Sequence, residues 1–316
     1  MSELAMTEAD YRAYLDADVW AFIEETWGWY PPDTIDNSVE EQRNIYDRMC
    51  RAFFNGYPEG VTARDESARD VPLRHYRRAS PESVAIVLYA HGGGFMVGGL
   101  DSHDDVCAEI CATTGLDVVA VDYRLVPEFT RIEAFEDCQT ALAWVRHQFN
   151  RPIILAGDSA GGFLSAALAI EERKAGDIAG QVLIYPSLGR LTESSGSMLR
   201  HARAPLLLAE EVAYYGRMME QAEAGREANF TIPLALEEFG NLPPAYVAPA
   251  ECDPICDDSL NFHTAIQRDG GVSELSVDEG LVHGHLRARH RAKRSGASFA
   301  RICDAISRMA SGQFGT

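Results

Sequence analysis

GDSAGG, at residues 157–162, is the stretch that decides how this chain folds. It follows an apolar run at residues 153–156, which suits a buried strand, and it leads into an apolar segment that suits a helix. A strand, a tight turn and a helix are the context in which Gly-x-Ser-x-Gly holds its serine in a strained conformation above a sheet. The glycines at positions 157 and 161 leave room for neighbouring backbone to approach. Ser159 is therefore the candidate nucleophile.

Short apolar runs alternate with helical patterns on both sides of this stretch. This alternation predicts an α/β fold with a mainly parallel central sheet flanked by helices. With 316 residues, of which 46% are hydrophobic, the chain suits a single domain of this kind with an insertion. Strands are predicted at residues 73–78, 84–89, 117–122, 153–156, 181–185, 245–250 and 273–277, with a turn at 80–83 between the first two. Helices are predicted at residues 104–113, 132–147, 162–175, 259–268 and 286–309.

Two regions fall outside the alternation. Residues 1–60 are rich in aromatic and helix-forming residues, and no strand is predicted before about residue 72. Pro31 and Pro32 divide this region into two predicted helices, and a capping-box spacing at residues 38 and 41 marks the start of the second. The region is either a helical packing layer or part of a lid over a pocket. An insertion at about residues 187–240 is expected to fold beside it.

Composition excludes several classes of partner. The chain has 48 acidic and 28 basic residues and a formal net charge of −20, which argues against nucleic acid or an anionic membrane as a partner. The first ten residues lack the pattern of a secretory signal, and no apolar run reaches a membrane-spanning length. The seven cysteines suggest reduced thiols in a cytoplasmic protein. Cys107 and Cys111, like Cys252 and Cys256, lack the spacing or histidines typical of metal sites, so no metal is expected.

The predicted closing helix, residues 286–309, has a basic start. Its first nine positions contain Arg287, Arg289, Arg291, Lys293 and Arg294. A charge run of this kind usually forms a solvated helix face, and here it would balance an acidic body. A site for an anion or a partner is the alternative.

A glycine-rich segment, HGGGF at residues 91–95, lies upstream of the serine and directly after a predicted strand. Three consecutive glycines are expected where backbone amides must turn toward a ligand and side chains would obstruct them. The amides of Gly92 and Gly93, together with that of Ala160, are candidate donors of an oxyanion hole. A phosphate-binding loop would add a Lys-Ser/Thr pair or a Gly-x-Gly-x-x-Gly spacing, and this segment has neither.

Downstream, an aspartate and a histidine follow predicted strands. Asp253 lies just past residues 245–250, at the edge where parallel sheets place their ligands, with Asp257 and Asp258 as alternatives. His283 lies in the loop after residues 273–277, where a base must lie to reach the serine, and His285 is its rival. The chain order Ser, Asp, His favours His283 and Asp253 as the partners of the serine.

Five motifs, taken in their order along the chain, resemble those of a known protein family. They are HGGGF at 91–95, YRLVPE at 123–128, GDSAGG at 157–162, the Asp-Pro at 253–254 with the aspartates at 257–258, and the His-Gly at 283–284. Together they resemble the bacterial hormone-sensitive-lipase-like family of α/β-hydrolase esterases. Residues 99–104 and 253–259 look most like the acetyl esterases. The resemblance extends from about residue 40 to residue 290.

The resemblance implies a carboxylesterase that acts on a small-molecule ester without a metal or organic cofactor. It implies a cap built from about residues 1–60 and 187–240, and a preference for short, acetyl-like acyl groups. A homodimer is an open alternative to a monomer. The site residues that it implies are Ser159 as nucleophile, His283 as base, Asp253 as its orienting acid, and Gly92, Gly93 and Ala160 as oxyanion donors.

The chain departs from the family pattern at two positions. His285 stands where the family often has phenylalanine, and Phe163 stands where it often has asparagine. Both departures bear on substrate preference and leave the three catalytic candidates intact. An amidase, a lactonase or a deacetylase could use the same three residues. A small-molecule receptor that has lost catalysis is the remaining alternative, and such a receptor should lack a working triad.

Overall fold

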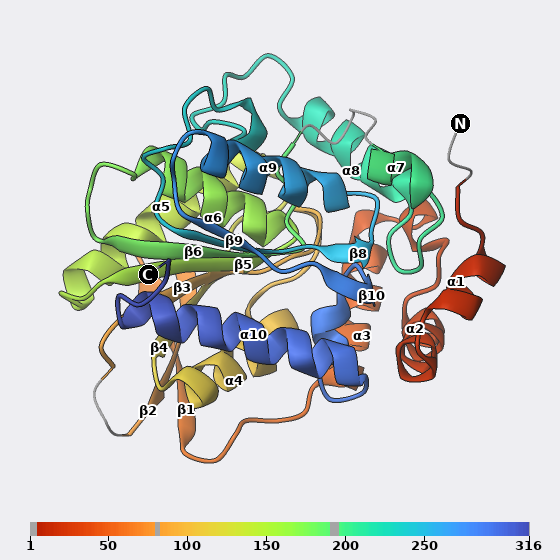
Figure 1. Ribbon diagram of the computed structural model, residues 1–316, viewed down its shortest axis with the longest axis horizontal. Coiled ribbons are helices and arrows are strands. Elements are labelled where there is room, and N and C mark those ends of the chain that lie inside the picture. The colour runs from red at the N-terminus through yellow and green to blue at the C-terminus, as the bar shows by residue number, and fades with distance from the viewer. Residues whose placement is uncertain (1–4, 80–82, 190–195, 316) are drawn as a thin grey trace.

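The computed structural model describes residues 5–79, 83–189 and 196–315, and its centre is an eight-stranded sheet (Figure 1). The strand order is β1-β2-β4-β3-β5-β6-β7-β9. From β4 to β9 all neighbours pair in parallel, whereas β1 and β2 pair antiparallel at one edge. The bounds are β1 Val61–Ala68, β2 Val71–Arg78, β3 Ile86–Ala90, β4 Asp117–Val121, β5 Ile153–Asp158, β6 Ile178–Ile184, β7 Ala245–Ala248 and β9 Ser273–Leu275. The predicted mainly parallel sheet is confirmed.

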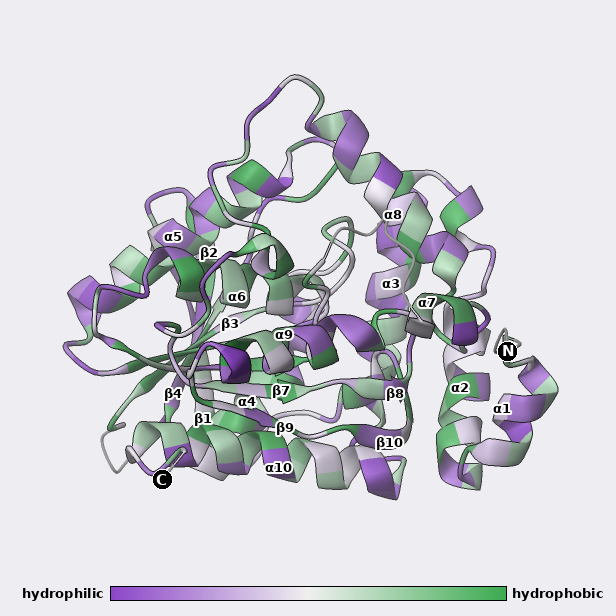
Figure 2. Ribbon diagram, turned by 45° about the horizontal axis from the view of Figure 1, so that its top comes forward, coloured by the Kyte–Doolittle hydropathy of each residue, from purple (hydrophilic) through white to green (hydrophobic). Residues whose placement is uncertain are grey.

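Helices cover both faces of the sheet. Helices α5 (Arg131–Gln148), α6 (Ala160–Glu171) and α9 (Cys256–Arg268) lie on one face, and α4 (Asp104–Thr114) and α10 (Lys293–Ala310) lie on the other (Figure 1). Because both faces are covered, strand β5 is buried at every position, which explains the continuous apolar sequence of its residues 153–156. Helix α10 alternates hydrophobic and hydrophilic residues, as expected of a helix with one buried face (Figure 2).

The sequence did not predict strand β1, Val61–Ala68. Its only partner in the sheet is β2, and most of its side chains are at least partly exposed. An edge strand with so few buried positions lacks the apolar run that marks the inner strands. The predicted turn at 80–83 lies largely outside the described residues, and β4 lies between the two strands that it joins.

The predicted strand 245–250 is divided in the structure, and a strand that was not predicted, β10 (Asp278–Val282), follows the predicted strand 273–277. After β7 and β9 the chain leaves the main sheet, and β8 (Ala250–Cys252) and β10 form a separate parallel pair. Pro249 lies between β7 and β8, and a proline has no N–H to continue a ladder. Its carbonyl accepts the amide of Asp278 at 2.9 Å, which joins the start of β10 to the same point.

The amino-terminal region contains three α-helices within residues 5–60, one more than predicted. They are α1 (Glu8–Tyr14), α2 (Ala17–Trp29) and α3 (Val39–Phe53). The Ser38 hydroxyl accepts the amide of Glu41 at 3.3 Å, which is the serine half of the predicted capping box. No helix in the described ranges is long and apolar enough to cross a bilayer.

The insertion contributes α7 (Gly196–Arg200) and α8 (Ala209–Ala222), which lie beside the amino-terminal helices (Figure 1). Tyr11 on α1 forms a 2.8 Å hydrogen bond between its hydroxyl and Nδ1 of His201. Gln42 on α3 donates its amide to the hydroxyl of Tyr214 on α8 at 3.0 Å. Two regions about 170 residues or more apart in the chain therefore touch above the carboxyl ends of the strands.

Candidate active site

Ser159 lies at the sharp turn between β5 and α6. Its backbone has φ 52° and ψ −118°, a strained conformation for a residue with a Cβ atom. A Cβ at Gly161 would collide with the carbonyl oxygen of Ala90, and one at Gly157 would collide with that of Gly161. The close backbone approach predicted for these two glycines is confirmed.

His283 joins Ser159 to Asp253. Its Nε2 lies 2.9 Å from the Ser159 Oγ, and its Nδ1 lies 2.6 Å from the Asp253 Oδ2. Asp253 is fully buried, and its second oxygen accepts the amide of Ile255 at 3.0 Å. With Nδ1–H donating to the carboxylate, Nε2 is left as the acceptor for the serine hydroxyl. The parallel pairing of β8 and β10 brings Asp253 and His283 together, because each residue follows one of these strands at the same edge.

The rival residues have other contacts. Asp257 accepts the amide of Ser197 at 2.9 Å through its Oδ2. Asp258 accepts the two backbone amides of residues 188 and 189, each at 2.8 Å, and burial raises its pKa to about 6. His285 is fully buried, with its Nε2 3.3 Å from Asp278 Oδ2. The two aspartates thus bond to backbone amides of the insertion, at residues 188, 189 and 197.

The hydrogen bonds of the glycine-rich loop contradict the role predicted for one site residue, Gly92. The amide of Gly92 donates to the Asp158 Oδ1 at 3.0 Å, so it is already bonded and the prediction that it serves the oxyanion hole is wrong. Gly93, Gly94 and Ala160 line the cavity above the serine, whereas Gly92 does not. In the described part of the chain, no acceptor bonds to the amide of Gly93 or Gly94. The first glycine anchors the loop, which leaves the next two amides free.

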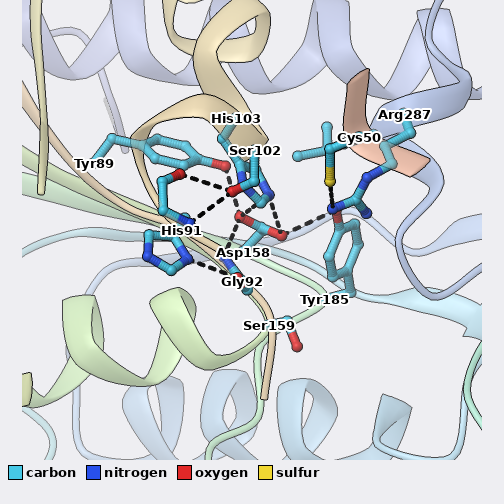
Figure 3. A network of polar contacts seen from close by, with 12 residues as sticks. Cys50, Tyr89, His91, Gly92, Ser102, His103, Asp158, Ser159, Tyr185 and Arg287 are labelled. Atoms are coloured by element: carbon cyan, nitrogen blue, oxygen red, sulfur yellow. Dashed lines mark hydrogen bonds and ion pairs between the residues drawn. The ribbon is translucent and has the colours of Figure 1, made fainter. Parts of the chain in front are cut away.

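Asp158 is the centre of a buried network next to Ser159 (Figure 3). Its carboxylate accepts the hydroxyl of Tyr89 at 2.8 Å and that of Tyr185 at 3.4 Å, and it lies 3.2 Å from Nε2 of His103. Burial alone would raise the pKa of Asp158, but the His103 ring and the Tyr89 hydroxyl outweigh burial and hold this pKa below its usual range. Through Gly92 the network ties the glycine-rich loop to the serine turn. Sequence reasoning missed this role, although Asp158 lies inside the quoted motif.

A family model described as the alpha/beta hydrolase fold matches residues 87–287. The chain belongs to this family. The match covers every residue of the geometry described above.

Individual relatives agree with this assignment. The α/β hydrolase is 35% identical over 210 residues to an esterase of Mycobacterium tuberculosis, covering 64% of this chain and 65%, just under two thirds, of that protein. It is 30% identical to an acetyl esterase of Salmonella schwarzengrund, covering 81% and 83% of the two chains. The structure of a hyperthermophilic esterase from the archaeon Pyrobaculum calidifontis matches with a TM-score of 0.79 and 29% identity, covering 87% and 95%. The resemblance to hormone-sensitive-lipase-like bacterial esterases is confirmed.

A cavity of about 760 Å³ opens above Ser159 in this hydrolase. Aromatic side chains from α2 and the residue that follows it, from α3 and from α8 form much of its wall, among them Trp27, Tyr30, Tyr46 and Tyr215. A mostly apolar wall with few polar groups is typical of a small-molecule site.

The two departures from the family pattern lie outside the cavity wall. Phe163 is buried between Phe95 and Phe230, with ring centroids 5.7 and 5.5 Å away. His285 lies under Tyr185, with ring centroids 5.0 Å apart, and Tyr185 in turn contacts the His283 ring at 4.8 Å. Both residues act on the site only through the side chains that they support.

The basic start of the predicted closing helix is only in part a solvated face, because Arg291, Lys293 and Arg294 are exposed whereas two other arginines turn inward. The chain after His283 forms a short 3-10 turn, η4 (His285–Ala288), and α10 begins only at Lys293. Arg289 is buried, with Nη2 2.6 Å from Asp105 and 2.7 Å from Glu109. Arg287 lines the cavity. The turn directs these two side chains into the protein, which a continuous helix from residue 286 would not do.

Glu211, on α8, is a second charged cavity residue that sequence reasoning missed. It is 5% exposed, and its Oε2 accepts the amide of Leu208 at 2.6 Å. Burial raises the pKa of Glu211 to about 7. In sequence, Glu211 looks like a residue that caps the start of helix α8, and nothing local indicates that it lines a cavity.

Glu211→Gln should change the pH dependence of stability. The folded-state pKa lies above the ordinary value of 4.5, so the stability that Glu211 contributes is complete below about pH 4.5 and is lost as the pH rises through 7. Glutamine does not ionise and escapes this loss. Between pH 5 and pH 8 the wild-type free energy of unfolding should fall relative to the variant by on the order of 3 kcal/mol. Calorimetry at both pH values checks this, with Glu210→Gln as the exposed control, and a pH-independent difference would contradict it.

Proposed function

We propose that this α/β hydrolase is a serine carboxylic ester hydrolase, with Ser159 as nucleophile, His283 as general base and Asp253 as the orienting acid. The observation that carries the proposal is the continuous hydrogen-bonded series from Asp253 through His283 to the Ser159 hydroxyl, at 2.6 and 2.9 Å. Relatives named as esterases support it. The substrate is a small-molecule ester.

The proposed mechanism has two steps. His283 takes the serine proton as Ser159 Oγ attacks the ester carbonyl, and the same proton then passes to the departing alcohol. The amides of Gly93, Gly94 and Ala160 are the donors for the oxyanion, since all three residues line the cavity. Water, activated by His283, then attacks the acyl-enzyme, which releases the acid and restores the serine. Only the chain's own residues and water take part.

Covalent labelling tests this function directly. A fluorophosphonate probe should label the wild-type chain at Ser159, because the base that activates the serine toward an ester also activates it toward phosphorus. Mass spectrometry of the digested protein would identify the peptide that contains residues 153–171. The Ser159→Ala variant is the control. A folded wild-type chain that ignores the probe would favour the receptor alternative.

Residues 1–60 and 187–240 form the cap in this proposal, within a single domain. The support is that helices α2 and α3 of the first segment and α8 of the second both line the cavity. The backbone amide of Met6 donates to the carbonyl oxygen of Arg200 at 2.9 Å, which joins the two segments. A cap of this kind limits bulk water around the reacting ester and still admits the water that hydrolyses the acyl-enzyme.

A preference for short acyl groups is part of the proposal, supported by the relative named acetyl esterase. Among nitrophenyl acetate, butyrate, octanoate and palmitate, kcat/KM should be highest for acetate or butyrate. It should fall at least tenfold by octanoate, because the aromatic wall of the cavity restricts long chains. Steady-state rates at substrate concentrations below micelle formation check this. Fastest turnover of palmitate would refute the preference.

A further inference from the structure

Arg287 lies four residues after His283 and lines the same cavity as Ser159. Its Nη2 donates to the hydroxyl of Tyr46 and lies 3.4 Å from the Sγ of Cys50, and the guanidinium carbon lies 4.9 Å from the centre of the Tyr46 ring. Burial raises the pKa of both Tyr46 and Cys50, so both partners are neutral groups near pH 7. The hydrogen-bond partners of this guanidinium therefore carry no charge.

The guanidinium also lacks an acceptor for part of its donor set. Its Nε is buried and has no hydrogen-bond partner among the described residues. In the same ranges, no carboxylate lies within ion-pair distance of it. Arg289, two residues on, is buried with two carboxylate partners. Arg287 is half-buried with a buried Nε, and a partly desolvated cation without a close carboxylate is costly, which distinguishes it from Arg289.

Asp158 is not the missing carboxylate partner of the Arg287 guanidinium. Its charge helps to offset that of Arg287, but its oxygens already accept from Tyr89, Gly92 and Tyr185 and contact His103. Figure 3 shows Arg287 on the Cys50 side of Tyr185, with the other partners of Asp158 grouped on the far side. The fork of Arg287 thus keeps donor capacity that the protein itself leaves unused.

We infer that Arg287 binds a carboxylate of the substrate, so that the hydrolase prefers esters whose acyl or alcohol half carries a carboxylate. This inference rests on the proposed function and names its substrate class. A guanidinium can donate two parallel hydrogen bonds to a carboxylate, which lysine cannot. A carboxylate bound where the guanidinium lines the cavity would supply the opposite charge that no described carboxylate provides within ion-pair distance.

Other charged groups that line the cavity are compatible with an anionic substrate. Glu8, Arg203 and Glu210 are exposed at the mouth, in water, where their fields are screened. Glu211 is buried on the α8 side, and its pKa of about 7 keeps much of it neutral below that pH. The preference should therefore be strongest at pH 6 and weaker at pH 8, where Glu211 is charged.

The test compares matched esters in two arms. Monoethyl succinate against ethyl butyrate places the carboxylate in the acyl half, and 3-acetoxybenzoate against phenyl acetate places it in the alcohol half. We expect wild-type kcat/KM to favour the anionic ester in one arm, and Arg287→Leu to lower that ratio roughly 10- to 100-fold. Arg287→Lys should restore part of the ratio. Arg217→Leu, which removes an exposed arginine of α8, should leave rates and ratio unchanged.

Rates are compared at fixed ionic strength, because a net charge of −20 slows the approach of any anion. A ratio that Arg287→Leu leaves unchanged in both arms would overturn the inference, even if both rates fall, since Arg287 would then only support the site. If that variant does not fold, competition decides on the wild type. Glutarate should inhibit ethyl butyrate hydrolysis at least tenfold more strongly than glutaramide, and equal inhibition would overturn the inference. Failure on every ester would refute the proposed function instead.

Discussion

Ser159→Ala is expected to lower kcat for nitrophenyl acetate by on the order of 10⁶-fold, the loss typical of removing a catalytic serine. The covalent step needs the Oγ atom, and no hydroxyl from another residue contacts Nε2 of His283 in the described part of the chain. The cavity and the free amides of Gly93 and Gly94 remain, so a small rate above that of water should persist.

Burst kinetics with nitrophenyl acetate measure this effect, because the wild type should release one nitrophenolate per active site before the steady state. Ser165→Ala, on the same helix α6 and away from the cavity, is the matched control. It should keep the burst. A Ser159→Ala variant with more than about 1% of wild-type activity and a normal fold would rule out this serine as the nucleophile.

Asp253→Asn is expected to lower kcat by on the order of 10⁴-fold with little change in KM. The carboxylate accepts Nδ1–H of His283 at 2.6 Å and is fully buried, so no water can take its place. An asparagine amide can donate to Nδ1 instead, which would put the proton on Nε2 and leave the serine without a base. The tautomer, and not the position of the ring, is what the variant changes.

Asp257→Asn is the matched control, because it changes a neighbouring aspartate that does not contact His283. Asp257 binds the amide of Ser197 at the start of the cap helix α7, and its replacement should change kcat by less than about tenfold. The comparison uses kcat for both variants between pH 6 and pH 9, with circular dichroism to check the fold. Equal losses for the two variants would show that Asp253 is not the specific partner of the histidine.

Much of the fold follows from local pattern. Continuous apolar runs correctly predicted the inner strands β3 to β7, because a strand buried on both faces has no polar positions to interrupt it. Strand β1 was missed for the opposite reason, since only one face of an edge strand is buried. Strand β10 was missed because it forms by pairing with β8, whose partner residues lie 28 and 30 positions away, and the local sequence pattern does not indicate that pairing.

In the candidate site, too, some features followed from local sequence and others depended on distant contacts. Ser159, Asp253 and His283 were predicted from motif order, and the structure brings the three side chains into hydrogen-bonding contact; their catalytic roles remain for the experiments above. The error at Gly92 arose because three glycines in a row look alike in sequence. Only Asp158, 66 positions later, distinguishes the bonded amide from the free ones.

By itself the sequence determined the α/β class, the strained turn at Ser159 and the order of the three catalytic candidates, because each depends on residue type over a few neighbouring positions. Tertiary structure alone decided which charges enter the cavity. In sequence Arg287 and Glu211 look like ordinary surface residues, but Arg287 is half-buried against Tyr46, 241 positions away, and Glu211 on α8 is buried. The environment of a charged group is set by whatever packs on it, and those contacts come from distant parts of the chain.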